Sequence, residues 1–432
     1  MTKLFYYLKR LFAYLFYIIF RPIWWLELLI PKSKSIWIFG AWYGKKYSDN
    51  PKWLFEYINS NEGKKITLKN GKKIIPVWIT KNKDVYKKLK SLNYKVHMSY
   101  TFAGIWTELR ASYSFLGSGN IDINPWFSNR IKQIWLWHGM PLKKIGYADQ
   151  ISVKNNTKLH RKIAQILNPY TMPKYYSTLT SADFFTTFLE QAFDIEREKV
   201  WNTGLPRNDS FFNNTWAEKK EVIIENLRVK YNGCKILFFL PTFRLAAIEA
   251  QESIDSSDSR HAYNAFDTKY GFNGQEFETF LEKNNIVFLY KPHFVDTGAK
   301  IDVKGDRFVY LDDSMFSDLY TLLNSVDGVI TDYSSVYFDF IASGKPLFLL
   351  PFDYEYYVTH SRAHFFDMKK EMGAPICTNW QQFYKAANLV KEDGTKRQWL
   401  APSKDEIKKF SEYCDGSSCR KVVEKVIEDA GK

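Results

Sequence analysis

Short apolar runs alternate with amphipathic segments along most of the chain, and this alternation constrains the fold more than any other feature. A first series of such runs occupies residues 35–203, and a second series occupies residues 235–350. Runs that are apolar along nearly their whole length are typical of strands buried on both faces of a parallel sheet. The sequence therefore predicts an α/β protein with two doubly wound, Rossmann-like domains.

The domain boundary is expected where the first series ends, which gives an N-terminal domain of residues 33–205 and a C-terminal domain of residues 206–432, closed by a C-terminal helix. The expected strands are Ser35–Phe39, Ile74–Ile79, Lys95–Ser99, Tyr113–Gly117, Gln133–Trp137, Phe184–Thr187, Val200–Thr203, Lys235–Leu240, Ile286–Tyr290, Arg307–Tyr310, Gly328–Thr331 and Pro346–Leu350.

Positive charge is concentrated near the amino terminus. Residues 1–100 hold 20 of the 61 Lys and Arg but only 5 of the 47 Asp and Glu, so they carry +15 and the rest of the chain carries −1. A region with this excess of positive charge is suited to bind either an anionic membrane or a nucleic acid.

Residues 1–32 predict an amphipathic helix that lies on a membrane surface. The longest stretch without charge or proline, Leu11–Phe20, is ten residues, about half the length of a spanning helix. Arg10 and Arg21 fall on a polar stripe opposite a broad apolar face, and Trp24 and Trp25 follow at a position suited to lipid headgroups. There are two alternatives: the helix packs on the protein's own core, or it spans the membrane.

Candidate chemistry lies where apolar strands end in polar residues, because ligands of such folds bind at the carboxyl ends of the strands. His138 is the first polar residue after the strand at 133–137, and Gly139 allows a close approach of backbone or ligand. An imidazole in this position acts as a general base or is a satisfied structural residue. Lys143, further along the loop, either holds phosphate or is solvated.

Two strand ends of the second series present cations. Thr242 and Arg244 follow the strand at 235–240, and Lys291 and His293 follow the strand at 286–290. A guanidinium fork suits bidentate phosphate contacts, although a structural ion pair also explains Arg244. Two cationic strand ends directed toward one crevice indicate a pyrophosphate ligand.

A third strand end of the second series carries hydroxyls. Asp332, Ser334 and Ser335 follow the strand at 328–331, directly before an expected helix. Either serine could cap that helix, whose free N–H groups favour an anion. Asp332 could order the turn or bind a ribose hydroxyl.

Several function classes lack their sequence signatures. The chain has no G-x-G-x-x-G after a strand, no Walker loop, no H-E-x-x-H and no Asp-x-Asp at a strand end. Its four cysteines form neither a disulfide scaffold nor a zinc set, and they are expected to be ordinary reduced thiols. We therefore expect neither a metal nor a cofactor.

Several motifs, taken together and in order, resemble the CDP-glycerol glycerophosphotransferase family, the teichoic acid primases and polymerases. The resemblance implies a two-domain GT-B fold with a central cleft, located at the cytoplasmic face of the bacterial membrane as a peripheral protein. The motifs are IWIFGAWYGKKYSDNPKWLFEY (Ile36–Tyr57), WHGMPLKKIG (Trp137–Gly146), GLPRND (Gly204–Asp209), LPTFR (Leu240–Arg244), YKPHF (Tyr290–Phe294), TDYSSVYFDF (Thr331–Phe340) and DGSSCRKVV (Asp415–Val423).

The resemblance also implies site roles. His138 and His293 would be catalytic, with His138 as the base on the acceptor side. The acceptor side would also include Asp49, Asn50, Gly139 and Lys143. The donor pyrophosphate would be surrounded by Thr242, Arg244, Lys291, Asp332, Ser334 and Ser335.

The expected reaction is transfer of a polyol phosphate, glycerol phosphate above all, from a CDP-activated donor to a hydroxyl of a lipid-linked saccharide or polyol-phosphate chain, with release of CMP. A GT-B glycosyltransferase that uses a nucleotide sugar is the alternative enzyme. A non-catalytic basic protein that binds membrane or nucleic acid is the third hypothesis, and the near-neutral charge around the candidate site weighs against it.

Overall fold

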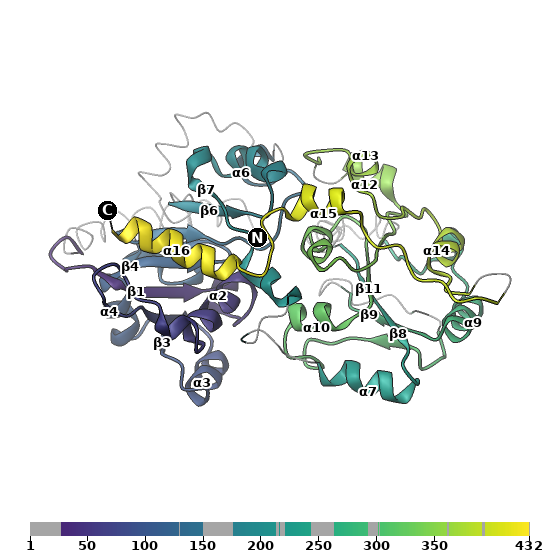
Figure 1. The fold of residues 1–432 in the computed structure, drawn as a ribbon, viewed down its shortest axis with the longest axis horizontal. Helices are drawn as coiled ribbons and strands as arrows, with labels where there is room; N and C mark the ends of the chain where they lie inside the picture. The colour runs from purple at the N-terminus through teal and green to yellow at the C-terminus, as the bar shows by residue number, and fades with distance from the viewer. Residues whose placement is uncertain are drawn as a thin grey trace, which may run out of the picture.

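The computed structural model describes residues 27–128, 130–149, 176–212, 216, 221–242, 263–292, 301, 303–360, 363–390 and 394–431. These residues form two α/β lobes side by side, each built on a parallel sheet (Figure 1). The prediction of an α/β protein with two parallel sheets is confirmed.

The first sheet has seven parallel strands in the order β3-β2-β1-β4-β5-β6-β7. Trp37 and Phe39 of β1 enter one core cluster and Ile38 enters another, and all three are fully buried. Burial on both faces explains why these strands are apolar along their whole length. The strands are β1 (Ser33–Gly40), β2 (Ile75–Thr80), β3 (Val96–Met98), β4 (Ala111–Leu116), β5 (Lys132–Trp135), β6 (Ser177–Thr180) and β7 (Val200–Asn202).

Two helices of the first lobe, α3 and α4, begin at side-chain caps. The Asn82 side chain accepts a hydrogen bond from the N–H of Asp84 at 2.8 Å, and the Thr101 hydroxyl accepts one from the N–H of Gly104 at 3.2 Å. The helices of this lobe are α2 (Asp49–Asn59), α3 (Lys83–Ser91), α4 (Phe102–Arg110), α6 (Thr186–Phe193) and, from the end of the chain, α16 (Ser418–Ala430).

The second sheet has five parallel strands in the order β10-β9-β8-β11-β12. Its strands are β8 (Lys235–Leu240), β9 (Ile286–Tyr290), β10 (Phe308–Tyr310), β11 (Gly328–Thr331) and β12 (Leu347–Leu349). Its helices are α7 (Val222–Lys230), α9 (Gly274–Asn284), α10 (Leu319–Ser325), α11 (Val336–Phe340), α12 (Tyr354–His360), α13 (Met368–Glu371), α14 (Trp380–Ala387) and α15 (Lys404–Ser411).

One expected strand is wrong. The segment 184–187 belongs to the 3-10 turn and the start of helix α6, and the strand of this region is β6, which precedes it. The sequence of β6 is Ser-Thr-Leu-Thr, and all four residues are buried. The Thr178 hydroxyl donates to the carbonyl of Trp135 at 2.9 Å, and the Thr180 hydroxyl donates to that of Ala182 at 2.7 Å. Because three of its four residues are polar, this strand gives no apolar run to detect.

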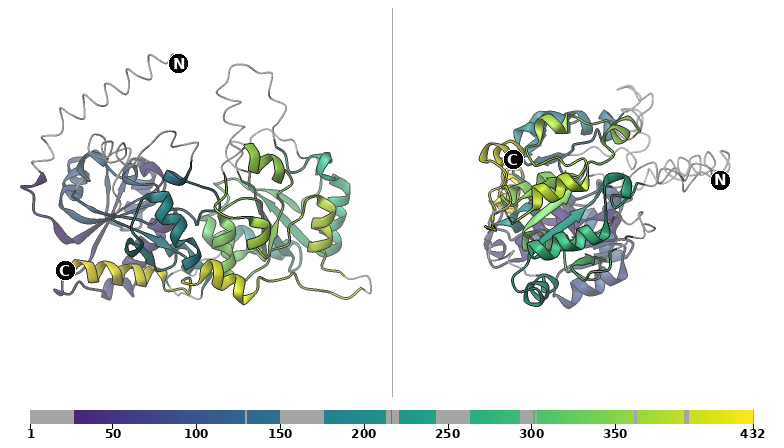
Figure 2. Two further views of the ribbon diagram at one scale, coloured as in Figure 1. Left: turned by 90° about the horizontal axis from the view of Figure 1, so that it is seen from above. Right: turned by 90° about the vertical axis from the view of Figure 1, so that its right-hand side faces the viewer.

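Helix α16 is an exception to the predicted division at residue 205, because it packs on the first lobe. Lys132 forms an ion pair with Asp429 at 2.7 Å, Tyr113 donates to the same carboxylate at 2.8 Å, and Lys34 donates to the carbonyl of Ala430 at 2.6 Å. Figure 1 and Figure 2 both show α16 along the first sheet, whereas α15 lies on the second lobe. The chain therefore crosses between the lobes twice.

The predicted membrane-surface helix of residues 1–32 falls, as far as residue 26, outside the described residues. In the part of the chain that the structure describes, none of the helices combines the length and the apolarity needed to cross a bilayer.

Candidate functional site

The loop after β5 holds His138 in a constrained backbone. Trp137 and Gly139 both have positive φ angles, 56° and 145°. Such a conformation is costly for a tryptophan and persists where the surroundings fix it. Here the Asn50 amide donates to the carbonyls of Leu136 at 3.1 Å and Trp137 at 2.9 Å. The position of His138 is therefore set by α2 as well as by its own strand.

The imidazole of His138 is arranged to accept a proton. Its Nδ1 lies 3.3 Å from the carbonyl oxygen of Gly117, and since a carbonyl only accepts, Nδ1 carries the hydrogen and Nε2 keeps its lone pair. Burial lowers the pKa of His138 below its usual 6.5, and the cation of Arg207 acts in the same direction against the carboxylate of Asp49 and the Gly117 hydrogen bond. The neutral form therefore predominates at pH 7.

Gly139 brings the first lobe against the second lobe. A Cβ on Gly139 would lie 2.4 Å from Oγ of Ser335 and 3.2 Å from a guanidinium nitrogen of Arg207. Any side chain at this position would collide, so the glycine permits the contact. The loop carrying the predicted base and the turn carrying the predicted donor serines are thus neighbours in space.

Asp332 orders the carboxyl ends of two adjacent strands of the second sheet. It is fully buried, and its Oδ1 accepts hydrogen bonds from the backbone N–H groups of Thr242 at 2.7 Å and Tyr333 at 2.6 Å. The sequence left two roles open for Asp332, ordering of the turn and binding of a ribose hydroxyl. These hydrogen bonds support ordering of the turn. The bonds hold Thr242 beside the turn that contains Ser334 and Ser335.

The two serines differ in their contacts. Ser334 Oγ accepts a hydrogen bond from the N–H of Val336 at 3.3 Å, whereas Ser335 is the N-cap of α11 and makes no side-chain cap bond. Helix α11 is five residues long. A helix this short has only a small dipole, so the prediction that this turn binds an anion depends on the two hydroxyls.

Lys291, at the end of β9, lies in a chain of charges that joins the lobes. It forms an ion pair with Asp313 at 3.0 Å, and Lys46 of the first lobe approaches the same carboxylate at 3.5 Å. Arg244 and His293 lie outside the described residues, but the strands they follow, β8 and β9, are adjacent in the sheet.

Next to the His138 loop lies a buried ion triad formed by Arg207, Asp49 and Asp339. The triad was not predicted from the sequence. The Arg207 guanidinium, 3% exposed, donates to Asp49 at 2.6 Å and to Asp339 at 2.6 and 3.2 Å, and its backbone N–H donates to Asn50 at 3.0 Å. The Tyr320 hydroxyl donates to Asp339 at 3.1 Å. Asp49 and Asn50, predicted on the acceptor side, are thus buried groups that position the His138 loop and join the two lobes.

Lys143, in the same loop as His138, contacts the second lobe. Its ammonium lies 5.2 Å from the ring centroid of Tyr357, and its backbone forms an antiparallel bridge with His364. The rings of Tyr357 and Tyr333 stack at 3.8 Å. Burial, and next the charge of Lys143, lowers the pKa of His364 to about 4. The loop of the predicted base is therefore held by the second lobe along its length.

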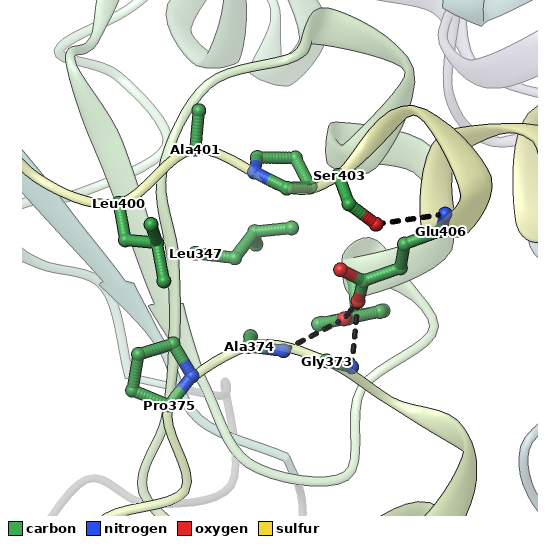
Figure 3. A pocket seen from close by; sticks show the side chains of 10 residues that line it. Leu347, Gly373, Ala374, Pro375, Leu400, Ala401, Ser403 and Glu406 are labelled. Atoms are coloured by element: carbon green, nitrogen blue, oxygen red, sulfur yellow. Dashed lines mark hydrogen bonds between the residues drawn. The ribbon is translucent and has the colours of Figure 1, made fainter.

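A pocket of about 230 Å³ lies elsewhere, on the second lobe, and contains none of the predicted site residues (Figure 3). Its polar groups bond one another: the N–H of Gly373 donates to Glu406 at 2.7 Å, and the Tyr337 hydroxyl donates to the same carboxylate. The pocket therefore offers little to a polar substrate.

Within the described ranges, no three His, Cys, Asp or Glu side chains are grouped so as to hold a metal ion. All four cysteines are buried free thiols.

Two parallel-sheet lobes that meet where the loop of His138 faces the turn of Ser335 form a two-lobed α/β protein of GT-B-like architecture. The family model of the CDP-glycerol:poly(glycerophosphate) glycerophosphotransferases matches residues 24–428. The chain belongs to this family, and it is a CDP-glycerol glycerophosphotransferase-like transferase.

Individual relatives are distant but cover the chain. A teichoic acid glycerol-phosphate transferase of Staphylococcus aureus is 25% identical over 91% of this chain and 93% of its own length. A teichoic acid poly(glycerol phosphate) polymerase of Bacillus spizizenii is 24% identical over 97% of this chain and 98% of its own. The structure of the wall teichoic acid polymerase TagF superposes with a TM-score of 0.65 at 19% identity, over 93% of this chain and 90% of that one, which shows a shared fold.

Proposed function

We propose that this protein transfers a polyol phosphate, most readily glycerol phosphate, from a CDP-activated donor to a hydroxyl of a lipid-linked saccharide or polyol-phosphate chain, in synthesis of teichoic acid or a related surface polymer. The observation that carries the proposal is the contact between Gly139 and Ser335, which puts a neutral imidazole beside a hydroxyl-rich strand end. The family supplies the class of donor.

In the proposed mechanism His138 Nε2 accepts the proton of the acceptor hydroxyl as its oxygen attacks the β-phosphorus of the donor. A new P–O bond forms, the bond to the bridging oxygen breaks, and CMP leaves with the electron pair. Ser334, Ser335 and Thr242 would bind phosphate oxygens, and Lys291 would offset the charge that develops on them. The predicted donor residues Arg244 and His293 follow the same two strands and would add to this charge.

The proposed location is the cytoplasmic face of the bacterial membrane, with the protein bound peripherally. Its support is the +15 charge of residues 1–100 and the amphipathic pattern of residues 1–32. A lipid-linked acceptor would then be presented to the cleft from the bilayer.

Product analysis tests the proposal. Purified protein is incubated with a lipid-linked acceptor and with CDP-glycerol, CDP-ribitol or nucleotide sugars, and the product mass and CMP are recorded. We expect CMP release and a mass gain of one polyol phosphate. A glycosidic product from a nucleotide sugar would instead establish the glycosyltransferase alternative, and absence of product with every CDP-polyol would refute the proposal.

Replacement of the predicted base separates chemistry from binding. His138→Ala is expected to abolish transfer while the Kd for CDP-glycerol stays within about threefold, because a general base acts on the acceptor. His97→Ala is the matched control, since His97 is also partly buried in the first sheet but lies on the edge strand β3. Equal loss of donor binding and transfer in His138→Ala would make this histidine structural.

A further inference from the structure

A row of exposed aromatic side chains runs along the carboxyl edge of the first sheet. In sheet order, the carboxyl ends of β5, β4, β1, β2 and β3 follow one another. His138 follows β5, Trp42 and Tyr43 follow β1, and Tyr100 and Phe102 follow β3. Neighbouring strands lie about 4.8 Å apart, so four steps across the sheet span about 19 Å. The row therefore leads away from the predicted base toward the far edge of the lobe.

The row is in contact with the site at one end. The ring of Trp42 lies 5.9 Å from the ring of His138. Trp42 and Tyr43 have positive φ angles of 48° and 61°, and the N–H of Tyr43 donates to the buried carboxylate of Asp122 at 2.7 Å. Asp122 also accepts from the N–H of Gly117 at 2.9 Å. The turn is thus fixed in a costly conformation that leaves Trp42 39% and Tyr43 53% exposed.

The far end of the row is more apolar. Phe102 is 83% exposed and Trp106 is 45% exposed, and their rings are parallel within 5° at 6.4 Å. Tyr100, two residues before Phe102, is 64% exposed, and the ammonium of Lys81 is 5.9 Å from its ring. Exposed aromatic rings of this number in one place mark an interaction surface.

Ammonium groups accompany the aromatic row. Lys46 lies 6.0 Å from the ring of Trp42, and Lys81 follows β2, between the two aromatic groups. Aromatic faces pack against the apolar faces of sugars, and ammonium groups pair with phosphates. A row that combines them is complementary to an anionic, polyhydroxylated chain.

We propose that this row, formed by Trp42, Tyr43, Lys46, Lys81, Tyr100, Phe102 and Trp106, binds the acceptor, with its reacting hydroxyl at His138 and its lipid-linked end toward Phe102 and Trp106. This inference rests on the proposed function and specifies the acceptor half of the site. The apolar rings lie where the lipid-proximal part arrives, and the basic side chains lie where its phosphates pass.

Two surface variants and a control test the proposal. Phe102→Ala/Trp106→Ala removes the far end, Tyr43→Ala removes a ring near His138, and Tyr310→Ala removes an aromatic side chain of the second lobe that is 51% exposed. The far-end variant is expected to lower kcat/KM for a lipid-linked acceptor about tenfold while leaving the KM for CDP-glycerol within twofold. With a water-soluble acceptor lacking the lipid, only Tyr43→Ala should lower kcat/KM.

Two binding measurements test the acceptor row independently of the transfer reaction. Binding of the lipid-linked acceptor in detergent micelles is measured without donor, and a loss in the far-end variant supports the row even if another donor proves correct. Sedimentation with anionic vesicles that contain no acceptor should be unchanged by the variants. Unchanged acceptor binding and kinetics would overturn the proposal. Loss of vesicle sedimentation in the far-end variant would also overturn it, because the surface would then dock on the membrane.

Discussion

Arg207→Met is expected to lower the free energy of unfolding by about 3–5 kcal/mol, because it leaves two buried carboxylates without their cation. The guanidinium is 3% exposed and makes three short contacts, one with Asp49 and two with Asp339. Three charge-assisted bonds of about 1.5–3 kcal/mol each would sum to about 4.5–9 kcal/mol, but they share one group and are not additive, so the expected loss is smaller. Since a protein is stable by only about 5–15 kcal/mol, the loss is a large fraction of the total.

Urea unfolding followed by tryptophan fluorescence measures the loss, and Arg228→Met is the matched control. Arg228 also pairs with an aspartate, Asp327 at 3.1 Å, but its side chain is 35% exposed, so we expect a loss below about 1 kcal/mol. Adding Asp339→Asn to Arg207→Met should restore part of the stability, because the asparagine carries no charge that needs a cation. A loss for Arg207→Met no greater than that of the control would refute the reasoning.

Three further predictions follow from the same loop and its contacts. Gly139→Ala should lower CMP release about a hundredfold in an otherwise folded protein, because the added methyl group meets Ser335 and shifts His138, and near-normal turnover would contradict this. The transfer rate should be on a plateau at pH 7 and fall only below about pH 6.5, because the neutral imidazole of His138 is the active form and burial lowers its pKa; a fall centred above pH 6.5 would contradict it. Because burial lowers the pKa of His364 to about 4, the folded state binds fewer protons there than the unfolded state, so its contribution to stability is complete above pH 6.5 and is lost as the pH falls toward 4. His364→Gln should flatten this part of the pH profile of urea midpoints, and an unchanged slope would contradict the assignment.

Apolar strands could be predicted from the sequence because each buries both faces, as β8 and β9 do. The strand β6 could not, because Ser177, Thr178 and Thr180 are buried without being apolar. The apolar pattern instead predicts a strand at the aromatic segment 184–187, which packs in the same core as a 3-10 turn and the start of α6.

His138 could be singled out from the sequence, with its role still a prediction, because it is the first polar group after an apolar strand. Arg207 could not, because its partners are far away in the sequence: Asp339 is 132 residues distant and Asp49 is 158. Ion pairs between residues so far apart leave no periodic pattern in the sequence. The motif GLPRND contains Arg207 but does not show that this arginine pairs with buried carboxylates. The arginine of the motif, directly after a proline, is the signal that could have prompted the search for carboxylate partners.

The return of α16 to the first lobe has a consequence for the order of assembly during synthesis. Val422, Val423 and Val426 cover a strip of that lobe, yet they leave the ribosome roughly 220 residues after β7. At a synthesis rate of about 5–20 residues per second, that strip waits about 10–40 seconds for its cover. Removal of α16 is therefore expected to expose a strip of the half of the protein that was made first.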